Sequence, residues 1–456
     1  MDTIFAQCSA RGKAGVAVFR ISGEKSIESL EKLIGAKTSK LKARQLYFRK
    51  IYHPVTKQLI DEAMVVFFSG NSSFTGEDSV EIHTHGSLAV IKMLNEVLES
   101  MPDLRLAEGG EFSRRSFLNG KMDLTAAEGL ADLIDAETEL QHKQAINQLG
   151  GGLEALYEQW RAELLALISL LEAYIDFPDE DIPEETLQQV KKSVENLINK
   201  IKAHLDDNNR GERLRSGLKL AILGKPNVGK SSLLNYLMRR DVAIISNIAG
   251  TTRDVIEGHL DIGGYPIILQ DTAGIHDGSS DLIEIEGIER AKKISQNSDI
   301  KIIMYDIAET AGLRALEEKD NVDYFSQLVD ENTIILLNKT DISEINETTT
   351  PSQIHGKTPI KVSVKKNMGM ENLMNSIISI AEKIAKPSDS PQITRARHRV
   401  QLEQALESLT RFSLNDDLVL ATEDIRISIR ALCGITGKIT VDEILGEIFS
   451  NFCIGK

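Results

Sequence analysis

The sequence of 456 residues is poor in cysteine, in aromatic residues and in long apolar runs. Its three cysteines, Cys8, Cys433 and Cys453, are too few for a disulfide framework or a four-cysteine zinc site, which favours a reducing compartment. No run reaches the roughly 18 apolar residues that a membrane-spanning helix needs. The first residues also lack the basic and then apolar segments of a secretory signal. We therefore expect a soluble, cytoplasmic protein.

The chain is also short of positive charge. It carries 53 Lys and Arg against 68 Asp and Glu, a formal net charge of -15. This balance argues against a general polyanion binder, which usually presents a basic stripe. The acidity is uneven, because residues 1–118 hold 16 basic and 14 acidic side chains whereas residues 119–215 hold 10 and 20. Any contact with a nucleic acid is therefore expected to be weak or local.

The length allows two to four domains at roughly 100–200 residues each. Residues 1–118 combine short apolar runs typical of strands, at Gly15–Ile21 and Ala63–Phe68, with helical spacing at Leu88–Leu98. We predict a mixed α/β domain here.

Long amphipathic helices follow from about Leu124. In Leu153–Ala173 apolar residues recur at three- and four-residue steps, which indicates the core of a helical bundle. Phe177-Pro178 ends this helix, and a second one is predicted over Glu184–Leu205. The predicted core positions of the first helix are Leu153, Leu156, Tyr157, Trp160, Leu164, Leu165, Ile168 and Leu171.

Strands and helices alternate over residues 216–382, which predicts a parallel sheet covered by helices. A linker at residues 387–391 precedes another helical stretch. Because the βαβ region stands between two helical stretches, we predict that it is inserted into one discontinuous helical domain. The predicted strands are Lys219–Leu223, Ile267–Leu269, Lys301–Tyr305 and Thr333–Leu337. The predicted domains are 1–118, 119–215, 216–382 and 383–456.

Gly224–Ser231 fits the phosphate-loop pattern G-x-x-x-x-G-K-S in full. It follows an apolar strand and opens a predicted helix at Ser232–Leu237, which is the required context. The glycines let backbone N–H groups cradle phosphates at a helix N-terminus. Lys230 is expected to reach the β- and γ-phosphates, and the Ser231 hydroxyl to bind magnesium.

Three further motifs follow in the order typical of GTPases. Asp271–Gly274 ends a strand and places a carboxylate near the metal and a glycine near the γ-phosphate. In Asn338–Asp341, the Asp341 carboxylate can accept hydrogen bonds from N1–H and the 2-amino group of guanine, which adenine does not offer, so it selects GTP over ATP. Ser363–Lys365 would support the base from its other side, with Val364 where many GTPases have alanine.

One absence in these motifs is informative. Many small GTPases have a glutamine after the glycine of Asp271–Gly274 to position the attacking water, but this chain has Ile275. The catalytic group must therefore come from a partner, a second subunit, a cation or another residue of the switch region.

The flanking motifs carry a family resemblance. Gly250–Asp254, together with Asn227, looks like a translation-factor-related GTPase. The segments Ser73–Asp78, Gly110–Ser113, Phe117–Leu124 and Cys453–Lys456 resemble the tRNA wobble-uridine modification GTPases of the MnmE/TrmE family. The match runs from Asp2 to Lys456. It implies an N-terminal α/β folate-binding domain that forms a homodimer, a discontinuous all-α domain and an inserted Ras-like P-loop GTPase domain.

The resemblance also implies a potassium-dependent GTPase that is activated when two GTPase domains meet. Asn227 would bind K⁺ through its side chain, and a K⁺ ion would neutralise charge between the β- and γ-phosphates as an arginine finger does. Thr252 would join Ser231 at Mg²⁺. The implied K⁺ ligands are Asn227, Ser246, Ile248 and Thr251. The implied GTP contacts are Asn227, Val228, Gly229, Lys230, Ser231, Ser232, Ser246, Asn247, Ile248, Ala249, Gly250, Thr251, Thr252, Asp271, Thr272, Ala273, Gly274, Asn338, Lys339, Asp341, Ser363, Val364 and Lys365.

The same resemblance makes Glu284 the catalytic acidic residue, in addition to the catalytic role of Lys230. It would orient the attacking water through a bridging water. The alternative is a solvated acidic residue in a charged loop, and Glu286 is a nearby competitor for the role.

By the family's reaction, an aminomethyl or carboxymethylaminomethyl group is added at carbon 5 of wobble uridine 34 of certain tRNAs. A separate partner, MnmG/GidA, uses FAD and NADH, and the one-carbon unit comes from 5-formyltetrahydrofolate or methylenetetrahydrofolate. This chain has no Gly-x-Gly-x-x-Gly after a strand, which fits that division of labour. The implied folate contacts are Arg20, Glu81, Lys121 and Lys456. Surface salt bridges and a frayed tail are the alternatives for the three cationic residues.

Other residues stay open between two interpretations. Cys453 is either a buried structural thiol or, as the resemblance suggests, a group in the tRNA chemistry. His83 and His85 alternate on a strand, where a structural role is favoured over a metal site. Two rival functions also remain: a signalling or assembly switch with a protein-adaptor domain, and a nucleotide-binding scaffold without turnover.

Overall fold

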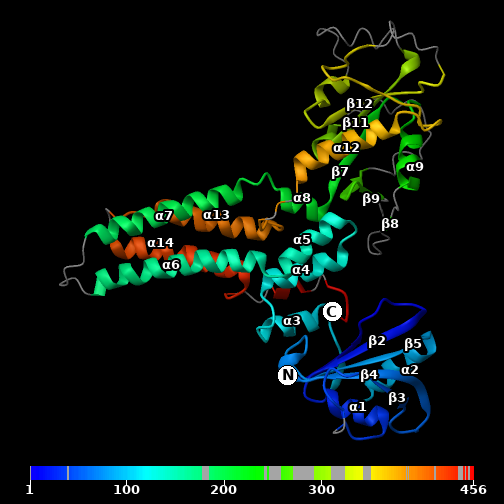
Figure 1. The fold of residues 1–456 in the computed structure, drawn as a ribbon, viewed down its shortest axis with the longest axis vertical. Coiled ribbons are helices and arrows are strands. Elements are labelled where there is room, and N and C mark those ends of the chain that lie inside the picture. Colours follow the sequence, from blue (N-terminus) through cyan, green and yellow to red (C-terminus); the bar gives the residue numbers. More distant parts are fainter. Residues whose placement is uncertain are drawn as a thin grey trace. The chain divides into compact units, whose positions relative to one another are not determined.

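The computed structural model describes most of the chain, and Figure 1 shows its elements. The residues described are 2–38, 41–176, 184–240, 244–245, 258–270, 292–309, 324–342, 351–386, 388, 390–414, 417–439, 445–446, 448–449 and 452–455. They form two compact units. The first contains Met1–Ala131, Gln148–Asp176 and Thr422–Lys456, and the second contains Asp132–Asn147 and Phe177–Ala421. The domain boundaries predicted above stay predictions.

The first unit contains a six-stranded sheet in the order β3-β4-β5-β2-β1-β6. All neighbouring strands are antiparallel except β1 and β6, which are parallel. The predicted strands at Gly15–Ile21 and Ala63–Phe68 are confirmed within β2 and β4. The strands are β1 (Thr3–Gln7), β2 (Ala14–Ser22), β3 (Tyr47–Tyr52), β4 (Leu59–Phe68), β5 (Ser79–Gly86) and β6 (Leu104–Leu106).

Two helices, α1 (Ser26–Ile34) and α2 (Leu88–Glu99), pack on this sheet. Each buries one apolar stripe, in α2 Leu94, Val97 and Leu98, against a core built by alternate residues of the strands. Helix α1 ends at Gly35, whose φ of 66° lets its N–H bond the carbonyl of Glu31. The predicted helix over Leu88–Leu98 is thus confirmed.

Helices make up the rest of the first unit: α3 (Glu111–Leu118), most of α4 (Leu124–Asp135), α6 (Gly152–Asp176) and most of α14 (Leu418–Thr436). The predicted stripe of α6 is buried at six of its positions. Leu165, however, is 39% exposed and Leu156 is half-buried, while Leu167 is buried instead. Steps of three and four residues leave more than one choice of inward-facing position. The face of the helix that is buried was therefore predicted correctly, but Leu156 and Leu165 were not.

The second unit contains a seven-stranded sheet in the order β13-β12-β11-β7-β10-β9-β8. The first five strands are parallel, and β9 and β8 continue antiparallel. All four strands predicted over residues 216–382 are present. The strands are β7 (Leu218–Gly224), β8 (Ile244–Ile245), β9 (Gly258–Ile262), β10 (Tyr265–Leu269), β11 (Ile300–Asp306), β12 (Thr333–Asn338) and β13 (Ile360–Lys361).

Cores form on both faces of this sheet, because successive residues of a strand point to opposite sides. Ile302 and Met304 of β11 lie in one core with α9 (Lys230–Arg240) and α12 (Met370–Ala385), whereas Ile303 and Tyr305 lie in the other. Burial on both faces is typical of parallel sheets. It explains the continuous apolar runs of β11 and β12 and confirms the α/β class.

Other described elements of the second unit are the greater part of α5 (Glu139–Leu149), α7 (Glu184–Leu205), α8 (Arg210–Ser216) and α13 (Ala396–Arg411), with short 3-10 turns η4 (Ile307–Glu309) and η5 (Tyr324–Leu328). A similar turn, η2 (Gly70–Ser72), lies in the first unit. Helix α7 has the predicted bounds. Within the described residues, no helix combines the length and apolar character needed to cross a bilayer.

Candidate functional site

The phosphate loop lies between β7 and α9. Gly224 and Gly229 have φ angles of 147° and 110°, which only glycine adopts readily, and these turns bring the loop back to the start of the helix. The Lys230 ammonium donates to the carbonyls of Gly224 and Lys225, both at 2.8 Å, so it lies across the mouth of the loop. Burial lowers the pKa of Lys230. Loop and lysine have the arrangement that binds phosphates.

Asn338 connects this loop to the predicted base-binding segments. Its side chain is buried, and Nδ2 donates to the carbonyl of Val228 at 2.8 Å while Oδ1 accepts from the N–H of Val364 at 3.2 Å. A Cβ on Gly229 would stand 2.2 Å from Nδ2, so the close approach needs glycine here. The three predicted segments therefore form one cluster at the carboxyl ends of β7, β12 and β13.

Asp341 is oriented by Ser363. The Ser363 hydroxyl donates to Asp341 Oδ1 at 2.6 Å, and this hydrogen bond lowers the pKa of the carboxyl group. Each carboxylate oxygen has two lone pairs, so Oδ1 can accept a second hydrogen bond and Oδ2 can accept from a ligand as well. Lys339, at the end of β12, forms an ion pair with Asp306 at 2.6 Å, a residue that the sequence analysis did not single out. The arrangement can accept two N–H groups from the edge of a flat base.

Several predicted residues lie outside the described residues. They are Ser246, Asn247, Ile248, Ala249, Gly250, Thr251, Thr252, Asp271, Thr272, Ala273, Gly274, Ile275, Glu284, Glu286 and Lys456. Their assignment stays a prediction. Asn227 is described and exposed, with a φ of 63°.

A second cluster lies on the sheet of the first unit. Arg20 of β2 and Glu81 of β5 are cross-strand partners, and the guanidinium donates to Glu81 Oε1 through Nη2 at 2.8 Å and Nε at 3.1 Å. The rings of Phe74 and Phe112 lie 5.3 and 5.5 Å from the guanidinium carbon. The motifs containing these phenylalanines were noted in the sequence, but their packing on Arg20 was not foreseen. Nε and Nη2 are committed to Glu81.

Lys121 does not join this ion pair within the described part of the chain; its ammonium donates to the carbonyl of Asn71 at 2.7 Å. The tail that precedes Lys456 lies beside the same domain. Ile454 pairs with Gly109, the N–H of Gly110 donates to the Cys453 carbonyl at 3.4 Å, and a Cβ on Gly455 would meet the carbonyl of Gln7 at 2.3 Å. The structure thus places residues 453–455 next to β1 and the start of α3.

The two open interpretations gain different amounts of support. Cys453 is exposed, so it is not the buried thiol of the structural alternative, whereas Cys433 is buried. His83 lies 3.4 Å from Glu81, and His85 Nδ1 lies 2.9 Å from Asp61. Among the residues described, no three His, Cys, Asp or Glu side chains gather as a metal site would require. These contacts with carboxylates agree with the structural role predicted for both histidines.

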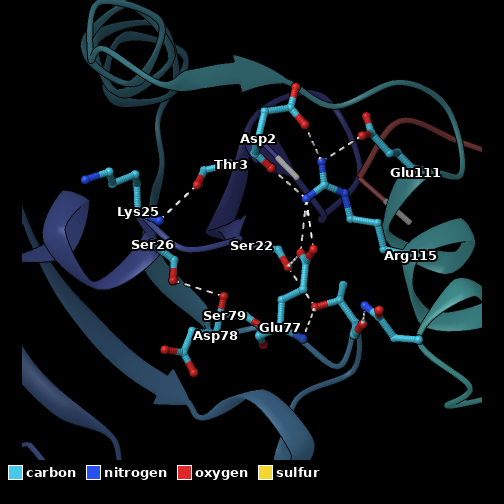
Figure 2. A network of polar contacts seen from close by, with 12 residues as sticks. Asp2, Thr3, Ser22, Lys25, Ser26, Glu77, Asp78, Ser79, Glu111 and Arg115 are labelled. Carbon is cyan, nitrogen blue, oxygen red and sulfur yellow. Dashed lines mark hydrogen bonds and ion pairs between the residues drawn. The ribbon is translucent and has the colours of Figure 1, made fainter.

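Figure 2 shows a polar network that the sequence analysis missed. Arg115 of α3, with a side chain 4% exposed, forms ion pairs of 3.0 Å with Asp2, Glu77 and Glu111. Ser22 also donates to Glu77, at 2.9 Å. Since three carboxylates share one buried cation, the network fixes α3, the chain start and the segment at residues 73–78 together. Its members are far apart in sequence, which hid them.

Together, the phosphate loop, the buried asparagine that joins it to the base-binding segments and the parallel sheet that carries both define a P-loop GTPase. Two family models match the chain: "GTP-binding protein TrmE N-terminus" over residues 3–121 and "MnmE helical domain" over residues 124–453. Curated relatives named tRNA modification GTPase MnmE are 59% identical in Rickettsia akari and 57% in Rickettsia prowazekii, each covering 100% of both chains. The chain belongs to the MnmE family of tRNA modification GTPases. This membership confirms the predicted family and the predicted enzyme class, a GTP hydrolase acting in tRNA modification.

Solved structures give weaker likenesses. The G domain of the T. maritima FeoB iron transporter is 25% identical, with a TM-score of 0.25. The match covers 36% of this chain and 98% of the FeoB chain. A GTP-binding protein from Sulfolobus solfataricus in complex with GDP is 14% identical, with a TM-score of 0.26, and covers 64% and 85%. TM-scores this low support no conclusion about this chain.

Proposed function

We propose that this chain hydrolyses GTP as a potassium- and magnesium-dependent homodimer in the cytoplasm. With a FAD- and NADH-using partner of the MnmG/GidA type, it adds an aminomethyl or carboxymethylaminomethyl group at carbon 5 of wobble uridine 34. The observation that carries the GTPase half is the Asn338 bridge, which joins the phosphate loop to Val364 through two hydrogen bonds. Family membership carries the tRNA half.

The residues of the phosphate loop fit the two cations. The Ser231 hydroxyl, in the first turn of α9, is an oxygen donor of the kind that Mg²⁺ prefers, and Thr252 would be its second protein ligand. The exposed Asn227 amide oxygen suits K⁺, and carbonyls of Ser246 and Ile248, together with Thr251, would complete the ligand set. Bound there, K⁺ supplies positive charge near the β- and γ-phosphates. Lys230 binds phosphate, and Glu284 orients the water.

The cation assignment is tested by measuring GTP hydrolysis in potassium and in sodium. We expect hydrolysis to fall by about tenfold or more in sodium, and Asn227→Ala to lose the potassium dependence while still binding GTP. Equal rates in both salts would contradict the K⁺ role. Glu284→Gln should abolish turnover and keep GTP binding, and Glu286→Gln is its matched control. If Glu286→Gln alone abolished turnover, the roles of the two glutamates would be exchanged.

The folate assignment rests on Arg20, Glu81, Lys121 and Lys456. Unshared donors of Arg20 suit the carboxylates of a glutamate tail, and a carboxylate suits the donor edge of a pterin. Binding of 5-formyltetrahydrofolate to the full chain, followed by calorimetry, tests this. We expect Arg20→Gln to weaken binding by about tenfold. If the unmodified chain does not bind the folate, an adaptor domain and a switch function would be favoured instead.

The tRNA reaction is tested by mass analysis of wobble uridines. A deletion strain should lack the modified nucleoside, and the unmodified gene should restore it whereas Glu284→Gln should not. Normal wobble uridines in the deletion strain would contradict the proposal. Turnover of GTP excludes the scaffold interpretation by itself.

A further inference from the structure

Half of the cations of residues 1–118 lie in one short segment. Residues 32–60, which we call the basic segment, hold no Asp or Glu, although acidic residues make up 68 of 456 in the chain and about four would be expected in this length. The chain as a whole carries a net charge of -15, so the segment stands out against it. Its cations are Lys32, Lys37, Lys40, Lys42, Arg44, Arg49, Lys50 and Lys57.

The basic segment runs along a free edge of the sheet. Its strand β3 is the terminal strand in the order β3-β4-β5-β2-β1-β6, and Figure 1 shows it at the border of the N-terminal sheet. Six residues of strand extend about 20 Å. Arg44 precedes β3 and its N–H donates to the Phe67 carbonyl at 2.8 Å, while Lys57 lies in the turn after β3. The cations therefore occupy the whole length of the edge.

Half of these cations have no acidic partner among the residues described. Lys32, Lys37 and Lys50 form ion pairs with Glu28, Glu31 and Glu62, respectively. No such pair exists in the described part of the chain for Lys42, Arg44, Arg49 or Lys57. Three of them are exposed, namely Lys42, Arg44 and Lys57. The guanidinium carbon of Arg49 lies 5.3 Å from the centre of the Tyr47 ring. Their charge is thus available to an anionic partner.

The same strand carries an exposed aromatic side chain, Phe48. Phe48 is 57% exposed, and its cross-strand partner Met64 is 36% exposed, so both face solvent on the side of the sheet opposite the core. Cations interleaved with exposed aromatic rings are typical of surfaces that bind RNA, because phosphates contact the cations and unpaired bases stack on the rings.

Protection of the sheet edge is the plainer explanation. Charged residues on an edge strand, lysine above all, prevent strand-to-strand aggregation, but this protection needs charge only on the strand itself. Here one sign extends into the loops on both sides. We propose that the basic segment binds the phosphate backbone of a folded RNA, with Phe48 as a stacking surface. The choice of tRNA as that RNA rests on the proposed function.

The test compares two full-length variants with the same change in net charge. The first carries Lys42→Gln, Arg44→Gln, Arg49→Gln and Lys57→Gln. The control carries Lys191→Gln, Lys192→Gln, Lys202→Gln and Lys383→Gln, which are exposed residues of α7 and α12. Binding of an unmodified tRNA transcript is measured by anisotropy from 50 to 200 mM salt. We expect the first variant to lose about tenfold or more in affinity, and its salt slope to fall by about 2 to 3.

Phe48→Ala separates stacking from charge. It should weaken binding by about fivefold and leave the salt slope unchanged. GTP hydrolysis and the thermal midpoint, unchanged in all three variants, show that they are folded.

Three results would overturn the proposal: equal tRNA affinity and salt slope for the two charge variants, loss of the homodimer in the first variant with tRNA binding kept, or loss of binding to anionic vesicles with tRNA binding kept. These results would not contradict the proposed function. A chain that restores wobble-uridine modification in the deletion strain without this contact would still be a tRNA modification enzyme. Conversely, if modification did not depend on this gene, RNA binding through the basic segment could still be measured.

Discussion

The Ser363 hydroxyl donates to Asp341 Oδ1 at 2.6 Å and so orients the carboxylate, whose two oxygens can together accept two N–H groups of a base. Asp341→Asn would replace an acceptor by a donor, and xanthine offers an acceptor where guanine has its amino group. We expect GTP affinity to fall by about tenfold or more and xanthosine triphosphate to bind better than GTP. Ser363→Ala should weaken both nucleotides alike. Competition binding measures this, and unchanged selectivity for guanine would contradict the base-reading role.

Arg115 is a second single residue with a testable role, in this case in stability. Its guanidinium is the shared partner of Asp2, Glu77 and Glu111, and its side chain is almost fully buried. Arg115→Met would leave Glu77, with a side chain 17% exposed, without its cation, whereas Asp2 and Glu111 would keep Arg105. We therefore expect the free energy of unfolding of the first unit to fall by about 3 kcal/mol. Urea unfolding measures the loss. Arg11→Met, at an exposed arginine of the same unit, serves as a control and should change stability little.

The same network gives a direction for the pH dependence. Burial alone would raise the pKa of Glu111, but hydrogen bonds from Arg105, the Glu108 N–H and Arg115 outweigh it and lower the pKa; the Arg105 hydrogen bond also lowers the pKa of Asp2. Because the folded pKa values lie below the unfolded ones, this stabilisation is complete above about pH 4.3 and is lost as the pH falls further. Arg105→Gln should flatten the loss of stability below that pH, as measured by thermal midpoints. An identical pH profile would show that the pair does not contribute.

At the scale of elements, much of the fold could be predicted because its signals are local. The buried strands β7, β11 and β12 are continuous apolar runs, and α7 has a regular apolar stripe. The phosphate loop carries its own residue pattern, so its place between a strand and a helix followed directly.

The parts that could not be predicted depend on contacts between distant segments. The packing of Phe74 and Phe112 around Arg20 joins a loop, α3 and β2, and no spacing in the sequence indicates it. Arg115 meets Asp2 across 113 residues. The choice of Leu167 over Leu165 in α6 is also set by its neighbours in the fold, since both positions continue the same stripe.

The C-terminal tail allows an element-scale prediction with a matched control. Gly110 and Gly120 both have positive φ, 67° and 66°, but a Cβ on Gly110 would meet the carbonyl of Phe449 at 2.4 Å, whereas nothing lies within 4 Å of one on Gly120. We therefore expect Gly110→Ala to displace residues 449–455 and Gly120→Ala to cost only about 1 kcal/mol of backbone strain. Hydrogen exchange of the tail should rise in the first variant alone. Equal exchange in both would mean that the tail does not depend on this contact.

At the scale of the whole molecule, the GTPase sheet is connected to helices by the two segments through which the chain passes. Asp132 Oδ1 accepts from Arg215 at 2.9 Å and from Arg395 at 2.7 Å, one residue just before β7 and the other after α12. Arg399 of α13 similarly joins Asp207 and Glu212 at 2.7 and 3.1 Å. A Cβ on Gly211 would meet the Ile393 carbonyl at 2.3 Å, so the segment before β7 and the segment after α12 are in close contact. We therefore expect nucleotide-dependent changes in the sheet to reach α7 and α13 through these contacts.

This arrangement predicts that Asp132→Ala weakens the connection without removing the nucleotide site. GTP stabilises the folded state that binds it, and in the unmodified chain that stabilisation should slow hydrogen exchange in α7 and α13 as well as in β7 and β12. In Asp132→Ala we expect the protection of β7 and β12 to persist and that of the two helices to fall by about fivefold, since two guanidinium groups lose their shared acceptor. Asp206→Ala, an exposed carboxylate of the same unit, should behave like the unmodified chain. If GTP protected α7 equally in both variants, the Asp132 contacts would be dispensable for the coupling, and the route would have to run through the contact of His259 in β9 with Glu137, at 2.9 Å.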